Sequence, residues 1–385
     1  MKLAYQKKNT SRPITRDILK ITGGFFGFII LFEIIVNILF PYPQDPQNTN
    51  PGTLPLYFDY GKSIEGKVRR QLGTSKENSA PIAQAGWLDP KDWQTLPSKA
   101  NTKQDLLVAI YGMSFTNDVA KAIKNIEPQI TIRKIDGPTA PPNHSFAAYS
   151  LDHENHDADV VVWGILASSV QGLNAMTGMT WGAEVPAPFT FPKYYLEQGN
   201  LKAVWPSIDS LESLRLAKQD QTKWQAFVTQ LQNNDNFYNT FSFEQNILDN
   251  SAIVRMIRRA WTQKFKTQTL SQIHSPKGFD DTWEGIAVLN EMIKQFAKTA
   301  KADGKLPIVL VINNVGYDDH LFTAIKPTLN KESIPYISTH DIVPASNMTN
   351  FISDGHFTPE ANQKIAQELI KLIEKEQSDV APSKE

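Results

Sequence analysis

Short apolar runs that alternate with helical patterns restrict the fold of this chain more than any other feature. Residues 105–112 (DLLVAIYG) and 130–136 (ITIRKID) are the first two runs, and the residues between them have helical spacing. Further runs follow at residues 157–166, 306–314 and 334–343, with helical patterns before or after them. An alternation of strands and helices is typical of a parallel sheet covered by helices. We therefore expect an α/β domain.

The alternation extends over residues 105–375 and is interrupted once. A segment at residues 167–279, far longer than the usual connection in a compact domain, separates the third and fourth predicted strands. We expect this insertion to cap a site or to bind substrate. The expected architecture is a three-layer α/β/α, flavodoxin-like parallel sheet of about five strands. Residues 376–385 are expected to form a disordered tail.

The N-terminal part of the sequence predicts a membrane anchor. Residues 21–40 are mostly apolar and long enough to cross about 30 Å of hydrocarbon as a helix. Lys and Arg outnumber acids in residues 1–20, which predicts a cytoplasmic basic tail and export of the rest of the chain. No small-residue cleavage site follows, so we expect an uncleaved, single-pass signal anchor in the cytoplasmic membrane, with the folded domain periplasmic or extracellular. The Pro-rich start of residues 41–104 is expected to be a spacer, and the rest a lead-in segment.

Polar and small residues within this apolar run admit two interpretations. Glu33 and Asn37 lie one helical turn apart, and Gly23 and Gly27 form a small-xxx-small pair. These residues could contact a partner protein in the membrane. The favoured interpretation is that Glu33 is protonated or reaches the headgroup region, and that the glycines are incidental.

Charge and composition exclude several classes of function. The formal net charge of -1 gives no overall field for nucleic acid, and the absence of cysteine excludes disulfides and thiolate chemistry. Residues 152–159 (DHENHDAD) have the composition of a metal site, but they lie at the amino end of the third strand, so we favour a solvated loop. The basic cluster Arg255, Arg258 and Arg259 is likewise expected to be a solvated helix face rather than a binding site. No metal or organic cofactor is implied.

Candidate functional residues follow four of the predicted strands. Ser114 follows the first strand, Gly137 the second and Ser168 the third, while Asp354 and His356 follow the fifth. In a parallel sheet these strand ends meet at one edge, where ligands bind. A serine nucleophile needs a general base, and the base needs an orienting acid, so these residues suffice for a catalytic triad. The backbone N–H groups of Ser114 and Gly137 are available to an oxyanion.

The same motifs resemble those of the SGNH (GDSL-type) hydrolase superfamily over about residues 105–375. The stretch YGMSFTND resembles the family's first block, which implies that Ser114 is the nucleophile. GPTAPPN resembles the second block, whose glycine N–H serves the oxyanion hole, and this implies that role for Gly137. DGHFTPEAN is similar to the last block and implies that His356 is the base and Asp354 its partner.

Two positions depart from the family pattern. Met113 stands where the first block usually has an aspartate. The third block usually carries an asparagine that donates to the oxyanion, and the corresponding position is about Ser168, whose hydroxyl can donate one hydrogen bond. Ser169, Asn143 or a residue of the insertion are alternative donors, whereas Asn314 is less expected to reach this position.

The resemblance implies ester chemistry. Its Asp-x-His spacing and its membrane anchor occur in members that act on polysaccharide acyl groups, so the implied substrate is an acyl ester, such as an acylated envelope polysaccharide. Hydrolysis by water and O-acyl transfer to a sugar hydroxyl both stay open. A catalytically silent scaffold that keeps the SGNH fold in an envelope assembly is the alternative from another class. The residues that bind substrate are not predicted.

Overall fold

A five-stranded parallel sheet forms the centre of the computed structural model, which describes residues 12–47, 53–102 and 105–380. The strand order is β2-β1-β3-β8-β9, and each neighbouring pair is parallel. The strands are β1 (Leu107–Gly112), β2 (Thr131–Asp136), β3 (Val160–Leu166), β8 (Leu306–Ile312) and β9 (Tyr336–Ser338). The predicted α/β class and the parallel sheet of five strands are confirmed.

Both faces of the sheet are buried by helices. Strand β1 shows the alternation, because Val108 and Ile110 join one apolar core whereas Leu107, Ala109 and Tyr111 join the other. On the first face lie α5 (Ser114–Ile126) and α15 (Pro359–Val380). On the second face lie α6 (Pro142–Asp152), α12 (Gly285–Ala302) and α13 (His320–Lys331).

Two element boundaries differ from the expected ones. The fifth strand, expected at residues 334–343, ends at Ser338, and α14 (Thr339–Ile342) follows at once. The Thr339 hydroxyl accepts a hydrogen bond from the Asn313 N–H at 2.9 Å, so a side chain takes a backbone donor that a longer strand would have paired. At the C-terminus, α15 continues to Val380, into the stretch expected to be a disordered tail, because Glu376 and Gln377 favour helix. Residues 381–385 of that tail lie outside the described residues.

The insertion and the lead-in segment fold together. The insertion contains a hairpin of β4 (Lys193–Glu197) and β5 (Asn200–Val204), a short pair of β6 (His274–Ser275) and β7 (Gly278–Phe279), and the helices α7 (Gly178–Trp181), α8 (Leu211–Gln219), α9 (Gln221–Asn234), α10 (Thr240–Phe243) and α11 (Ala252–Ser271). The lead-in helices are α2 (Thr53–Tyr60), α3 (Ile64–Leu72) and α4 (Pro81–Gln84). Gln71 of α3 donates to the Pro186 carbonyl at 2.8 Å, so the lead-in segment packs on the insertion.

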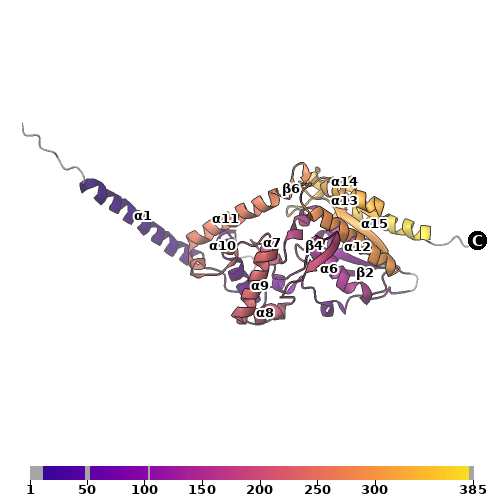
Figure 1. Ribbon diagram of the computed structural model, residues 1–385, viewed down its shortest axis with the longest axis horizontal. Helices are drawn as coiled ribbons and strands as arrows, with labels where there is room; N and C mark the ends of the chain where they lie inside the picture. The colour runs from indigo at the N-terminus through magenta and orange to yellow at the C-terminus, as the bar shows by residue number, and fades with distance from the viewer. Residues whose placement is uncertain (1–11, 48–52, 103–104, 381–385) are drawn as a thin grey trace, which may run out of the picture.

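Helix α1 (Arg12–Leu39) projects from one end of the molecule (Figure 1). Its stretch Arg16–Leu39 is long and apolar enough to cross a membrane, and most of its large apolar side chains are exposed. Glu33 and Asn37 both contact α11. Glu33 therefore has partners within the chain, whereas the favoured interpretation had it protonated or reaching the headgroup region. The basic cluster on α11 is also not a solvated face, because Arg255 and Arg258 are buried.

Helix α5 lies very close to the sheet where its first turn begins. A Cβ atom at Gly112 or at Gly164 would overlap the side chain of Thr116. Thr116 is buried, and its hydroxyl has no hydrogen-bond partner among the described residues. Two strand glycines therefore admit Thr116 between them, and this contact sets the height of Ser114 above the sheet.

We predict that Gly164→Ala will lower the free energy of unfolding by about 1–3 kcal/mol, because the added methyl overpacks against Thr116. Adding Thr116→Ala should recover most of that loss, since it removes the atoms that clash. Urea unfolding of the detergent-solubilised full chain measures both effects. Equal stability of Gly164→Ala and the wild type would show that α5 does not depend on this contact.

Candidate active site

Ser114 is the first residue of α5, and only Met113 separates it from the end of β1. The residue before it, Met113, has an extended backbone (φ -125°, ψ -167°), and its side chain lies in the apolar core. Where the family pattern has a polar aspartate, this chain therefore has a core residue. Ser114 itself is half-buried, and its hydroxyl points to His356.

The loop before α15 holds His356 and Asp354. An antiparallel bridge joins Phe351 to Phe357, and the His356 carbonyl accepts from the Ile352 N–H at 2.8 Å. Gly355 has a φ of 87°, a left-handed conformation that favours glycine. This tight turn presents the two polar side chains on its outer side. Thr358 then caps α15, as its side chain accepts from the Ala361 N–H at 3.2 Å.

The structure brings Ser114, His356 and Asp354 together in the order of a catalytic triad. His356 Nε2 lies 2.7 Å from Ser114 Oγ, and His356 Nδ1 lies 3.1 Å from Asp354 Oδ1. The imidazole also stacks on Phe115, with ring centroids 4.6 Å apart and planes at 21°. The ring is thus held by a hydrogen bond at each nitrogen and by an aromatic face, which leaves Nε2 facing the hydroxyl.

Asp354 is ionised but exposed. The hydrogen bonds from the His356 backbone N–H and then from the His356 ring hold the pKa of this carboxyl below its ordinary value. Its side chain is 62% exposed, against 28% for the His356 side chain. Water therefore screens the charge, and Asp354 can orient the ring more than it can stabilise an imidazolium.

Gly137 lies beside the start of α5. Gly112, the last residue of β1, pairs with Asp136, the last residue of β2. Met113 and Gly137 are therefore the first residues after two adjacent strands. A Cβ at Gly137 would lie 2.9 Å from the His144 ring, which is a packing reason for glycine here. Whether the Gly137 N–H serves an oxyanion stays a prediction.

Ser168 forms a reciprocal pair with a residue that sequence reasoning had set aside. Its hydroxyl accepts from Asn314 Nδ2 at 3.0 Å, and its backbone N–H donates to Asn314 Oδ1 at 3.2 Å. Because the hydroxyl oxygen already accepts one bond, its own proton is free to be directed elsewhere. The signal for Asn314 was present in the sequence: it follows β8, the neighbour of β3.

Two other donor candidates have structural partners. The Ser169 hydroxyl donates to the Leu166 carbonyl at 2.8 Å. The Asn143 amide donates to the carbonyls of Ala175 and Pro192, at 3.2 and 3.0 Å. Both groups hold the chain in or next to the 3₁₀ helix η3 (Ala167–Asn174) at the start of the insertion, so neither is a good donor to an oxyanion.

The segment 152–159 is not a solvated loop throughout. Asp152 is fully buried and pairs with Arg133 at 2.5 Å, while the Tyr111 hydroxyl donates to Asp152 at 2.8 Å. His156 is also buried and lies 2.8 Å from the same hydroxyl. The expected solvated loop is wrong here because the partners, Arg133 and Tyr111, come from the sheet. Among the described residues, no group of three or more His, Cys, Asp or Glu side chains could hold a metal ion.

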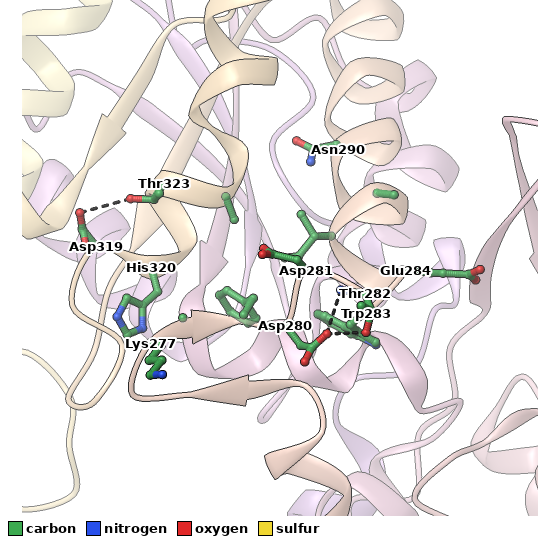
Figure 2. A pocket seen from close by; sticks show the side chains of 15 residues that line it. Lys277, Asp280, Asp281, Thr282, Trp283, Glu284, Asn290, Asp319, His320 and Thr323 are labelled. Atoms are coloured by element: carbon green, nitrogen blue, oxygen red, sulfur yellow. Dashed lines mark hydrogen bonds between the residues drawn. The ribbon is translucent and has the colours of Figure 1, made fainter.

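A separate cavity of about 840 Å³ lies between β7 and the first turns of α12 and α13 (Figure 2). Asp280, Asp281 and Asp319 line it together with Trp283 and His320. None of the three triad residues is among the described residues that line this cavity. The cavity and the triad are therefore different features of the surface.

Comparisons with known proteins add little to this geometry. The sequence matches no protein-family profile, and no curated protein matches it significantly. One solved structure aligns with 70% of this chain and 97% of its own, at 9% identity and a TM-score of 0.34. A likeness this low carries no argument about fold or function.

His144 generates a prediction about acid stability. It is buried under Phe189, its Nε2 lies 2.7 Å from the Gly86 carbonyl oxygen, and its Nδ1 has no partner among the described residues. Burial lowers the pKa of His144 from 6.5 to about 4. As the pH falls, His144 is therefore protonated at a higher pH in the unfolded chain than in the folded chain. The contribution of His144 to the free energy of unfolding is lost as the pH falls from 6.5 toward 4.

We predict that the difference in unfolding free energy between the wild type and His144→Gln will shrink by up to about 3 kcal/mol between neutral pH and pH 4. Glutamine keeps a donor for the Gly86 carbonyl but does not titrate. Urea unfolding at a series of pH values measures the difference. Parallel stability curves would mean that His144 is protonated equally in the folded and unfolded chain.

Proposed function

We propose that this protein is a serine esterase, an acylhydrolase of the SGNH (GDSL) type, that acts through Ser114, His356 and Asp354. The observation that carries the proposal is the 2.7 Å contact between His356 Nε2 and Ser114 Oγ, made by residues 242 positions apart in the chain. A serine that only capped α5 would bond to the backbone of its own helix. Instead, its hydroxyl bonds to a histidine that Asp354 orients.

In the proposed reaction Ser114 Oγ attacks the ester carbonyl carbon while His356 Nε2 takes the hydroxyl proton. The negative charge on the carbonyl oxygen would be met by the N–H groups of Ser114 and Gly137 and by the Ser168 hydroxyl. The C–O bond to the alcohol then breaks, and His356 returns the proton to the departing alkoxide. Water, deprotonated by His356, releases the acid and restores Ser114.

The fold supports the proposal through its strand order. Numbered along the chain, the sheet order is 2-1-3-4-5, the order of flavodoxin-like doubly wound sheets. In such sheets ligands bind beyond the carboxyl ends of the strands, where Ser114 stands. We therefore assign the domain to the three-layer, flavodoxin-like class as part of this proposal.

We further propose an envelope polysaccharide ester as the substrate, met outside the cytoplasmic membrane. The exposure of Asp354 and His356 favours a bulky substrate, because an open site admits a polymer. Helix α1 supports single-pass anchoring, and the basic residues before it favour a cytoplasmic N-terminus with the domain periplasmic or extracellular. A sugar hydroxyl in place of water would make the same triad an O-acyltransferase.

The full chain in detergent should hydrolyse p-nitrophenyl acetate, and Ser114→Ala and His356→Ala should each lower kcat by about 1,000-fold or more. Asp354→Asn should cost only about 10–100-fold, because a screened, exposed carboxylate contributes less than a buried one. Thr358→Ser, two residues after His356, keeps the hydroxyl that caps α15, so it is the matched control and should retain full activity. Activity that survives Ser114→Ala would contradict the choice of nucleophile.

A scaffold role makes the opposite prediction for these variants. A folded wild type without turnover of any ester, with or without an added sugar acceptor, would favour the catalytically silent alternative. Faster release of p-nitrophenol on addition of a sugar alcohol, with the acyl group recovered on the sugar, would instead show transfer.

Ser168 and Asn314 provide a test of the oxyanion site. If the Ser168 hydroxyl donates to the oxyanion, Ser168→Ala should lower kcat by about 100-fold with little change in KM. Asn314→Ala should have a smaller effect, because the hydroxyl is kept but loses its orientation. The double variant should be no worse than Ser168→Ala. Unchanged kcat in Ser168→Ala would assign the pair a structural role only.

A further inference from the structure

Polar contacts join the last turns of α1 to the first turns of α11. The Glu33 carboxylate accepts from the Ser251 hydroxyl at 2.5 Å and from the backbone N–H groups of Ala252 and Ile253 at 2.6 and 3.0 Å. It thus caps the N-terminus of α11, where an anion is favoured. Arg255 donates to the Asn37 side chain at 2.8 Å, one turn further along both helices.

Apolar packing supports the same junction. Val36 and Ala252 are buried against Phe58 of α2, and Phe32 and Phe40 pack around them. Helix α11 leaves this junction at a wide angle to α1 rather than continuing its line (Figure 1). The direction of α1 therefore fixes the direction in which α11 runs.

The length of α1 sets the depth of this junction. Glu33 lies 17 residues after Arg16, which corresponds to about 26 Å along a helix. A hydrocarbon layer of about 30 Å that begins near Arg16, rather than at residue 21 as expected from the sequence, ends within the next turn beyond Glu33. The first turn of α11 contacts Glu33, so α11 must begin at the surface of the membrane that α1 crosses.

Large apolar side chains are exposed on and just before α11. We call this set the docking face, and its members with their exposed fractions are Ile247 (84%), Leu248 (48%), Met256 (37%), Ile257 (56%) and Trp261 (48%). Ile257 and Trp261 are four residues apart and so share one side of the helix. Arg255 and Arg258, three residues apart, are buried on the side of α11 that faces the domain, and Arg258 pairs with Asp249 at 2.7 Å.

We propose that the docking face lies in the headgroup and upper acyl region of the outer surface of the membrane, so that α11 is an interfacial helix. An amphipathic helix whose apolar side faces lipid lies in the plane of the membrane with that side buried by about 5–10 Å. Trp261 suits this level, because indole rings favour the membrane–water interface. The domain is thus fixed against the membrane at two places, α1 and α11. This inference depends on α1 crossing the membrane and not on the chemistry of Ser114.

The absence of native cysteine makes a direct test possible. The full chain is reconstituted in phosphatidylethanolamine–phosphatidylglycerol nanodiscs, and single variants Ile257→Cys, Ile34→Cys and Gln295→Cys are labelled with the fluorophore NBD. Residue 257 probes the docking face, residue 34 probes α1, and residue 295 is an exposed position on α12. Phosphatidylcholine with a nitroxide on carbon 5 of its acyl chain is the quencher.

We expect about a twofold loss of emission at positions 257 and 34, and almost none at position 295. Ester turnover by each labelled protein reports that the domain is folded, or circular dichroism does so if turnover is absent. Quenching at position 34 without quenching at position 257 would overturn the docking of α11 while leaving the anchor intact. No quenching at either position would overturn both.

Discussion

The close approach of α5 to the sheet is the contact on which the candidate site depends. Gly112 and Gly164, on adjacent strands, leave room for Thr116, so the first turn of α5 starts directly above the carboxyl edge of β1. This places Ser114 just beyond the carboxyl end of β1. Because α15 packs on the same face as α5, the loop that precedes α15 brings His356 to the serine hydroxyl. A methyl group on either glycine would shift Ser114 relative to His356.

The elements that the sequence predicted best were those whose pattern is local. The continuous apolar runs of β1, β3 and β8 predict strands that are buried on both faces. Once these strands are predicted, the residues that lie at their ends can be read from the sequence. Ser114 could be singled out because it comes just after such a run, and Asp354 and His356 because they come just before the cap of a predicted helix. The misjudged features depend on partners far away in the chain. Asp152 is buried because Arg133 neutralises it, and nothing near residue 152 indicates that partner.

The same limit applies to the residues where α1 meets α11. Glu33 appeared to be an isolated acid within an apolar helix, and Arg255 and Arg258 appeared to be a solvated basic face. Glu33 caps the helix that carries Arg255, and Arg258 pairs with Asp249. Each of these charged side chains has a partner whose separation in the sequence matches no helical or strand spacing. These contacts also join α1 to the insertion.

The central claim is that the Ser114 hydroxyl is an activated nucleophile and not a helix cap. Treatment of the full-length protein with a fluorophosphonate, followed by intact-mass and peptide analysis, tests it most directly. We predict one covalent adduct per chain, located on Ser114, with labelling that becomes much slower in His356→Ala. A folded protein that takes up no label, or whose label lies on another serine, would contradict this account.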